Sequence, residues 1–213
     1  MQISLEKIPP STSLLGIGGI QRGVEPHKLV SAGHRAHLIA NALGGEAFAV
    51  GRIRPRNAFC VQAANAYYLF VHRDYRAYRT LFRRFFHTIP VGCDIDHVFS
   101  KGLAARIGVP FLLLAAVPKS ANRSHASAER RGLAPCRSVF LEKTFPLDER
   151  MFHKAMGRRL GMRQSASVVR LGYSLGAKHE LGLTLKQRGI WNQAFCIDAV
   201  EAGLAPRSIL RPI

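Results

Sequence analysis

Short apolar runs, separated by polar or Gly- and Pro-containing stretches, give this 213-residue chain its pattern. Residues 111–117 (FLLLAAV) are continuously apolar and predict a buried strand. Residues 89–98 (IPVGCDIDHV) predict another strand, and residues 100–107 predict a short helix or loop. Ser120 is a good N-cap for a helix that continues to about Arg131. The expected local order is therefore strand, connector, strand, helix.

The segment before this series carries aromatic residues at helical spacing. Residues 72–87 predict a helix with aromatic residues recurring on one face, namely Tyr75, Tyr78, Phe82 and Phe85. Its arginines lie largely elsewhere on the surface: Arg73, Arg76, Arg83 and Arg84. We expect the aromatic face to pack in the core, and the arginine face either to be solvated or to contact phosphate groups.

Further helices are expected on both sides of the central series. An apolar segment over residues 34–43 predicts a helix that ends at two glycines. Asp148 can cap a helix that continues through Leu160, and residues 185–202 predict a third helix. Residues 1–30 are rich in Gly, Pro and Ser and are expected to form an irregular arm.

Basic residues outnumber acidic residues by more than two to one. The chain has 31 Lys and Arg against 13 Asp and Glu, a formal net charge of +18. Of the basic residues, 23 are Arg, whose planar guanidinium pairs bidentately with phosphate. This bias favours a nucleic-acid partner. The alternative is the Arg-rich composition that a GC-rich genome produces.

Several classes of protein are disfavoured. No run of 18 apolar residues is present, so we expect no membrane partner. The first residues lack the charged start and apolar stretch of a secretory signal, so we expect a cytoplasmic protein, with delivery into another cell left open. The cysteines form no CxxC pair, which disfavours a zinc finger and fits a reducing compartment. No P-loop, GxSxG or GxGxxG motif supports a kinase, an ATPase or a serine hydrolase.

Acidic residues are scarce in the middle of the chain, so their positions are informative. Residues 47–128 contain three, Asp74, Asp94 and Asp96, against twelve Lys or Arg. Strand alternation puts Asp94 and Asp96 on one face and His97 on the other, and a twist at the strand end brings Asp96 and His97 toward one cavity. A carboxylate can bind a hard divalent cation, and an imidazole can accept a proton near neutral pH. This combination suits metal-assisted phosphodiester hydrolysis, whereas the alternative is that both acids pair with surface arginines.

The predicted helix after the second strand carries matching polar residues. Asn122 and His125 are three residues apart, so they share a helix face, and both can ligate a metal. The start of the helix also favours a phosphate through its free N–H groups and dipole. The alternative for Asn122 is hydrogen bonding to the backbone at the helix start.

The motif DIDH, followed after 24 residues by NR in a strand–strand–helix frame, resembles the HNH (ββα-metal, or His-Me finger) endonucleases. It is most similar to the HNH domain of the RNA-guided CRISPR nucleases. The resemblance implies that His97 is the general base that activates water. It also implies that Asp96 and Asn122 hold one divalent ion, Mg²⁺ or Mn²⁺, with His125 as a further ligand and Asp94 in a supporting role.

The resemblance and the pattern together predict an α+β fold. Residues 89–135 are expected to form an HNH-like ββα core, wrapped by a basic and aromatic helical segment at residues 1–88 and a mostly helical segment at residues 136–213. We expect the three parts to pack as one compact unit. The expected nucleic-acid-binding residues are Lys119, Arg123, Arg130, Arg131, Arg83 and Arg84.

One feature departs from the HNH pattern. The family usually has a middle Asn or His that orients the general base, and residues 98–121 contain neither. Ser100, Lys101 or a backbone carbonyl group would have to hold the His97 ring.

A second segment has a weaker likeness to nucleases. Residues 33–41 (GHRAHLIAN), with Gly44-Gly45 and later asparagines, are similar to the DRGH–LGG–N pattern of non-specific DNA/RNA endonucleases. His34 stands in place of the usual Asp, and no acid precedes His37. The alternative is that His37 is a helix residue and the glycines cap that helix.

The first functional hypothesis is therefore a metal-dependent endonuclease that cleaves DNA, with RNA as the alternative substrate. The second is a non-catalytic nucleic-acid-binding protein on a decayed HNH frame, which the missing middle residue motivates. A third is a protein whose basic surface meets an acidic protein, such as an immunity or delivery protein. A toxin or effector, a defence nuclease and a mobile-element protein are all compatible with the sequence.

Overall fold

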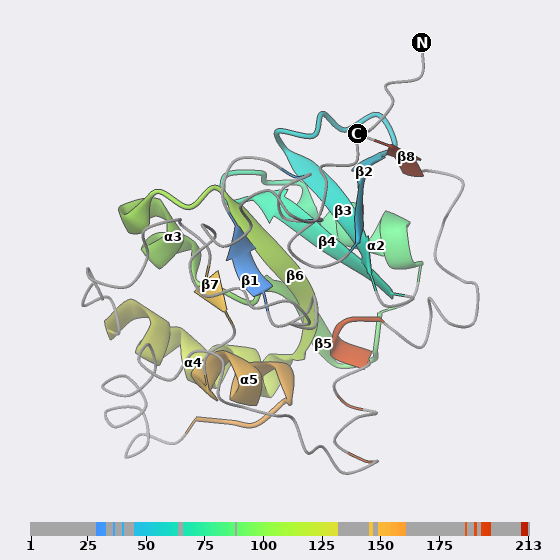
Figure 1. Ribbon diagram of the computed structural model, residues 1–213. Coiled ribbons are helices and arrows are strands. Elements are labelled where there is room, and N and C mark those ends of the chain that lie inside the picture. Colours follow the sequence, from blue (N-terminus) through green and yellow to red (C-terminus); the bar gives the residue numbers. More distant parts are fainter. Residues whose placement is uncertain are drawn as a thin grey trace.

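Strands from distant parts of the chain form a single antiparallel sheet (Figure 1). The computed structural model describes residues 29–32, 36, 40, 45–63, 66–87, 89–131, 145–146, 149–160, 186, 190, 193–196 and 210–212. The strands are β1 (Leu29–Ala32), β2 (Glu46–Val50), β3 (Ala58–Ala63), β4 (Ala66–His72), β5 (Cys93–His97), β6 (Phe111–Pro118), β7 (Phe145–Pro146) and β8 (Leu210–Pro212). The helices are α2 (Tyr78–Phe86), α3 (Lys101–Ile107), α4 (Lys119–Arg131) and α5 (Glu149–Ala155). The sheet order is β7-β1-β6-β4-β3-β2-β8, and β5 pairs with β6 off this path.

The central strand is β6, which pairs with three other strands. Its first residues pair with β1 and β4, and residues from Leu114 to Pro118 pair with β5. All of its residues except Pro118 are buried. Because both faces of β6 are covered, every position of the strand must be apolar or small, which explains its unbroken hydrophobic sequence.

Helices cover both faces of the sheet. On one face, alternate strand residues cluster with the apolar side of α2; this cluster includes Cys60, Leu69, Leu114, Phe82 and Phe85. On the other face, the intervening strand residues cluster with α3, α4 and α5; this cluster includes Phe59, Phe70, Leu113, Leu103, Ala121 and Met151. α4 and α5 contact each other and lie side by side in Figure 1. The described elements therefore form three layers, with the sheet between α2 and the other helices.

Several sequence predictions are confirmed. The fold is mixed α and β, and the predicted order of strand, connector, strand and helix is present as β5, α3, β6 and α4. The aromatic face of α2 is in the core, and Arg83 and Arg84 are exposed as expected. The helix that begins at Lys119 starts one residue before the predicted cap Ser120.

Residues 1–88 are predicted to form an arm and a basic and aromatic helical segment, and the helical prediction is wrong for residues 46–72. Residues 46–72 supply β2, β3 and β4, and the predicted helix at residues 72–87 begins only at Tyr78, because His72 ends β4. Pairing between neighbouring strands stabilises this segment, and no local signal revealed that pairing.

Other boundaries shift by smaller amounts. β5 begins at Cys93 rather than at residue 89, after a turn in which Gly92 has a φ of 79°. α5 ends at Ala155 rather than near Leu160, because Gly157 adopts a φ of 70° two residues later. The predicted arm at residues 1–30, the helix at residues 34–43 and the helix at residues 185–202 fall mostly outside the described residues.

Two observations bear on the expected cellular environment. Among the helices that the structure describes, none is both long and apolar enough to cross a membrane. Three of the four cysteines, Cys60, Cys93 and Cys196, are described, and each is a free thiol. Cys136 lies outside the described residues.

Gly45, just before β2, approaches β3 so closely that a side chain has no room. A Cβ atom there would lie 2.1 Å from the backbone oxygen of Gln62. We expect Gly45→Ala to lower the free energy of unfolding by about 1–3 kcal/mol, because backbone atoms of β3 must move. Urea unfolding measures this change.

A matched control is Gly102→Ala, within α3. Its added Cβ would find Ser100 Oγ as the nearest atom, at 3.9 Å. We expect a gain of about 0.5–1 kcal/mol, because Ala is the better helix former. Equal stabilities of the two variants would contradict the packing of Gly45 against β3.

Candidate active site

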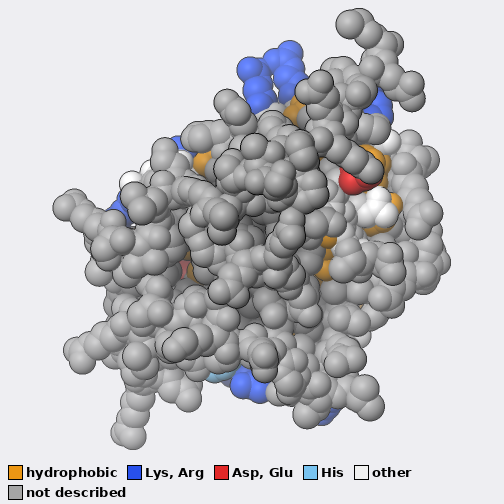
Figure 2. Space-filling model, viewed as in Figure 1, with side chains coloured by type: hydrophobic (Ala, Val, Ile, Leu, Met, Phe, Trp, Pro, Cys, Tyr) orange, Lys and Arg blue, Asp and Glu red, His pale blue; other side chains and the backbone are white. Residues whose placement is uncertain are grey.

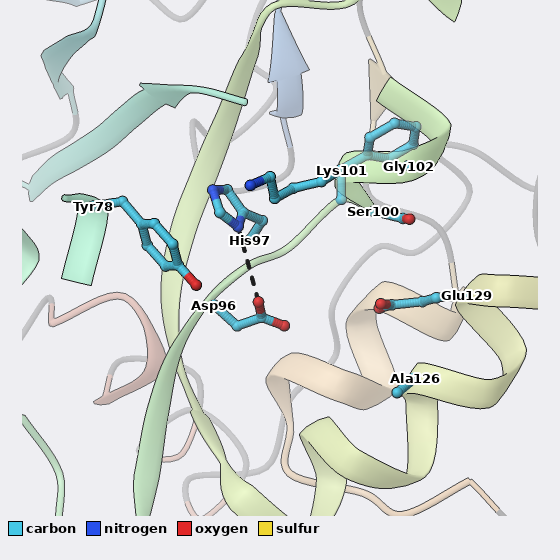
Figure 3. Close-up of a pocket in the computed structure, with 9 residues that line it drawn as sticks. Tyr78, Asp96, His97, Ser100, Lys101, Gly102, Ala126 and Glu129 are labelled. Atoms are coloured by element: carbon cyan, nitrogen blue, oxygen red, sulfur yellow. Dashed lines mark ion pairs between the residues drawn. The ribbon is translucent and has the colours of Figure 1, made fainter. Parts of the chain in front are cut away.

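A pocket of about 360 Å³ lies at the end of β5, where the DIDH motif is located (Figure 3). Three layers of the fold contribute to its walls. The lining residues are Tyr78 from α2, Asp96 and His97 from β5, Phe99, Ser100, Lys101 and Gly102 at the start of α3, and Ala126 and Glu129 from α4. The pocket therefore gathers the predicted general base and one predicted metal ligand.

Asp96 and His97 leave β5 toward opposite layers. His97 packs against α2, where the centroids of the Tyr78 and His97 rings are 4.4 Å apart. Asp96 faces α4 and α5, where its carboxylate meets the ammonium group of Lys154. This arrangement follows from the alternation of side chains along a strand. It leaves Asp96 Oδ1 and His97 Nδ1 3.9 Å apart, too far for a hydrogen bond.

His97 is buried in the wall of the pocket, and one ring nitrogen has no partner. Its side chain is 3% exposed, and Nε2 makes no hydrogen bond. Buried polar atoms usually have partners, so an unpartnered imidazole nitrogen at a pocket is a candidate for contact with a ligand or with the reacting water. The Tyr78 ring packs against the His97 ring, and Lys101, one of the residues predicted to hold that ring, lies beside it in Figure 3.

The environment keeps His97 neutral. Burial is the largest cause and, together with the nearby positive charges of Lys101, Lys154 and Arg79 and against the opposing effect of Asp96, it lowers the pKa of His97 to about 4. At neutral pH the imidazole therefore has a free lone pair that can accept a proton. Burial also raises the pKa of the Tyr78 hydroxyl, and the negative charge of Asp96 contributes to this increase.

Asp96 is held by a buried lysine. Lys154 Nζ donates hydrogen bonds to Asp96 Oδ2 at 2.6 Å and to Glu129 Oε1 at 2.8 Å. A longer bond of 3.5 Å reaches the backbone oxygen of His97. Burial alone would raise the pKa of the Asp96 carboxyl, but the charge and hydrogen bond of Lys154 outweigh burial and hold that pKa below its usual value.

The end of α5 is fixed against α4, and this fixes Lys154. The Gly157 N–H donates to the Lys154 carbonyl, closing the last turn of α5. Ser124 Oγ on α4 accepts a hydrogen bond of 2.9 Å from the Leu160 N–H. His125 Nε2 lies 3.0 Å from the carbonyl oxygen of Arg158, so this nitrogen donates and carries the ring proton.

The predicted metal ligands on α4 are not gathered around Asp96 in the pocket wall. Asn122 is half-buried and is not among the residues that line the pocket. His125 is fully buried and bonded to the chain after α5. Across the part of the chain that the structure describes, no group of three or more His, Cys, Asp or Glu is arranged to hold a metal ion. The metal roles of these residues stay predictions.

The predicted nucleic-acid-binding residues lie on two helices. Lys119 and Arg123 are exposed at the start of α4, and Arg83 and Arg84 are exposed on α2. The backbone of Arg130 and Arg131 belongs to the end of α4, and their side chains lie outside the description. On the face shown in Figure 2, described Lys and Arg side chains lie at separate points around the rim.

Three residues of the site were not predicted as site residues: Tyr78, Glu129 and Lys154. Glu129 lies seven residues after Asn122, a spacing that puts both on one helix face, so helical periodicity could have identified it. Tyr78 was assigned to the core with the other aromatic residues of α2. Lys154 is 58 residues from Asp96 in sequence, and no local pattern connects them.

The upstream segment with the weaker nuclease likeness lies largely outside the described residues, including His34 and His37. Asn57 is described and lines a different pocket, together with Arg56 and His72. Asp94, the predicted supporting residue, is half-buried on β5 opposite Val117.

Comparison of the chain with protein-family models, curated proteins and solved structures gave no match.

The lowered pKa of His97 generates a stability prediction. Between about pH 6.5 and pH 4, the unfolded chain binds a proton at His97 and the folded chain does not. The free energy of unfolding should therefore fall as the pH drops through this window, by about 3 kcal/mol in total from this group. Urea unfolding across the window measures the slope.

His97→Gln removes this titration, so its slope should be shallower than that of the wild type. His87→Asn, an exposed histidine at the end of α2, serves as the control and should retain the wild-type slope. Identical slopes for all three proteins would show that His97 titrates at its ordinary pH.

Proposed function

We propose that this protein hydrolyses phosphodiester bonds in nucleic acid, with DNA as the favoured substrate, RNA as the alternative and His97 as the general base. The observation that carries the proposal is the neutral, buried His97 whose Nε2 has no partner in the wall of a pocket. The surrounding positive charge supports the proposal, because Lys101 lines the same pocket and arginines on α2 are exposed. Positive side chains beside a base suit a phosphate substrate.

The arrangement of elements also supports the resemblance to HNH endonucleases. β5 and β6 pair antiparallel, and α4 follows β6 directly and contacts both strands. The register puts Asp96 opposite Ala115 and His97 opposite Leu114. His97, the proposed general base, thus lies on the first strand of a strand–strand–helix unit.

In the proposed reaction, His97 Nε2 accepts a proton from water while the water oxygen attacks phosphorus. The bond from phosphorus to the leaving oxygen breaks, and that oxygen takes a proton from solvent. Lys101 would lie near the phosphate oxygens and stabilise their developing negative charge. A bound phosphodiester adds negative charge near His97, which raises the pKa of the ring toward the range of an effective general base.

The resemblance also implies a divalent ion, Mg²⁺ or Mn²⁺, on Asp96, Asn122 and His125. The arrangement of these residues does not fit such an ion. Lys154 holds Asp96 Oδ2 at 2.6 Å, and neither Asn122 nor His125 lines the pocket with Asp96. We therefore derive no step of the reaction through a metal.

Nucleic acid would reach the pocket along α2. Arg79, Arg83 and Arg84 are exposed on this helix, Arg76 is exposed just before it, and Tyr78 belongs both to the helix and to the pocket wall. Arg79 Nε also donates to the backbone oxygen of Ile95 on β5 at 3.5 Å, which connects the helix to the strand of the motif. Such a basic path can position a phosphate backbone without reading bases.

The second candidate is a nucleic-acid-binding protein without turnover. Two observations favour it: His97 is almost fully buried, and the Asp96 carboxylate is already neutralised by Lys154. This candidate predicts salt-dependent binding and no cleavage.

The cleavage test uses His97→Ala. Plasmid, linear and single-stranded DNA and RNA are incubated with each protein in Mg²⁺, Mn²⁺ or EDTA. We expect the variant to lose about 10²–10⁴-fold in cleavage rate, because its general base is gone, with its Kd for the same substrate nearly unchanged. His87→Asn should cleave like the wild type. Equal rates for His97→Ala and the wild type would refute the assignment, and binding without cleavage by the wild type would favour the second candidate.

The binding test uses Arg83→Ala/Arg84→Ala. If both arginines contact phosphates, the double variant should bind nucleic acid more weakly, and the slope of log Kobs against log salt should shrink by about 2. Arg158→Ala/Arg159→Ala removes the same charge from exposed positions after α5 and is the matched control. Equal losses in the two double variants would show that net charge alone, rather than the α2 face, governs binding.

A further inference from the structure

Three oxygen atoms converge on the ammonium group of Lys154. They come from two elements: the side chain of Asp96 and the backbone of His97 on β5, and the side chain of Glu129 on α4. Lys154 itself belongs to α5 and is 1% exposed. A protonated lysine has three N–H donors, so the three oxygens can satisfy the whole group.

The two carboxylates around the ammonium group make removal of Lys154 energetically costly. A buried ammonium is costly unless it is paired and hydrogen-bonded, and here two carboxylates lie within 2.8 Å of it. The same cost applies in reverse, because removing Lys154 would leave Asp96 and Glu129 close to each other without a counter-charge. The lysine and the two acids therefore stabilise one another.

The position of Lys154 is also fixed by its backbone. Met151 and Ala155, on either side of it in α5, are buried in the core cluster beneath the sheet. The chain after α5 is tied to α4 through Ser124 and His125. Withdrawal of the ammonium group from its three oxygens would require α5 to shift or the long side chain to find another buried path.

Carboxylate and carbonyl oxygens are also the ligands that hard divalent cations select. Asp96, Glu129 and the His97 carbonyl thus form a cation site of the same chemistry as an Mg²⁺ or Mn²⁺ site. The unpartnered His97 Nε2 belongs to the wall of the pocket that Asp96 and Glu129 also line.

We propose that Lys154 is the resident cation of this site and that it excludes divalent ions from Asp96 and Glu129. The positive charge that the sequence resemblance assigns to a metal ion beside Asp96 is supplied by the protein itself. The inference rests on the proposed function only in that the same pocket is the candidate active site, and its test measures metal binding rather than cleavage.

The experiment titrates Mn²⁺ into the full chain and measures bound metal by electron paramagnetic resonance. The proteins are the wild type, Lys154→Met, Lys154→Met/Asp96→Asn and the control Lys101→Met, which removes an exposed lysine from the same pocket. We expect the wild type and Lys101→Met to show no site that depends on Asp96. Lys154→Met should gain one bound Mn²⁺ per chain, and the double variant should lose it.

Thermal unfolding is measured as well, because Lys154→Met can lose stability. Mn²⁺ should raise the Tm of Lys154→Met and leave the wild-type Tm unchanged, because the ion replaces the missing counter-charge. If Lys154→Met does not fold with or without Mn²⁺, the Mn²⁺ binding of the wild type is compared with that of Asp96→Asn to test the proposal. Equal Mn²⁺ binding by these two proteins supports exclusion by Lys154.

Two outcomes would overturn the proposal. One is a wild-type Mn²⁺ site that Asp96→Asn abolishes, since the ion would then reach Asp96 despite the lysine. The other is a folded Lys154→Met that gains no Mn²⁺ site. Neither outcome depends on turnover, so a protein that fails the cleavage test of His97 can still pass or fail this one.

Discussion

The burial of β6 between two helical layers is the constraint on which the rest of the structure depends. Both faces of this strand are covered, and its edges pair with β1, β4 and β5. Its apolar side chains join α2 on one side and α3, α4 and α5 on the other. A shift of one residue in the pairing of β5 would exchange the layers that Asp96 and His97 face, so the register of β6 determines the geometry of the pocket.

Because Asp96 and His97 are consecutive on β5, their side chains face different layers of the fold. His97 lies with Tyr78 of α2, in surroundings that lower its pKa and keep it neutral. Asp96 lies with Glu129 of α4 and Lys154 of α5. The pocket opens where these two environments meet, at the end of the strand. A base without a charge and a carboxylate with a counter-charge are thus held a short distance apart but not bonded.

The ion group around Lys154 connects this pocket to the core. A lysine with two carboxylates leaves one net negative charge, which the surrounding basic residues can offset. Replacement of the buried group by apolar residues is often tolerated in proteins, so stability alone does not account for it. Its position beside the proposed general base is consistent with a role in holding Asp96 and the end of β5. The ion group around Lys154 is thus involved in the proposed reaction, in the proposed exclusion of divalent ions and in the packing of α5.

The sequence by itself determined β6, α4, the aromatic core face of α2 and the polar residues of the DIDH motif, because each depends on periodicity or capping within a few residues. It did not reveal β2, β3 and β4, whose stability comes from pairing with one another. It also could not connect Lys154 with Asp96, because 58 residues separate them and only the packing of α5 against α4 and β6 brings them together. Local chemistry indicated a cation beside Asp96. The tertiary structure places Lys154 beside Asp96, because contacts between layers depend on the whole fold rather than on neighbouring residues.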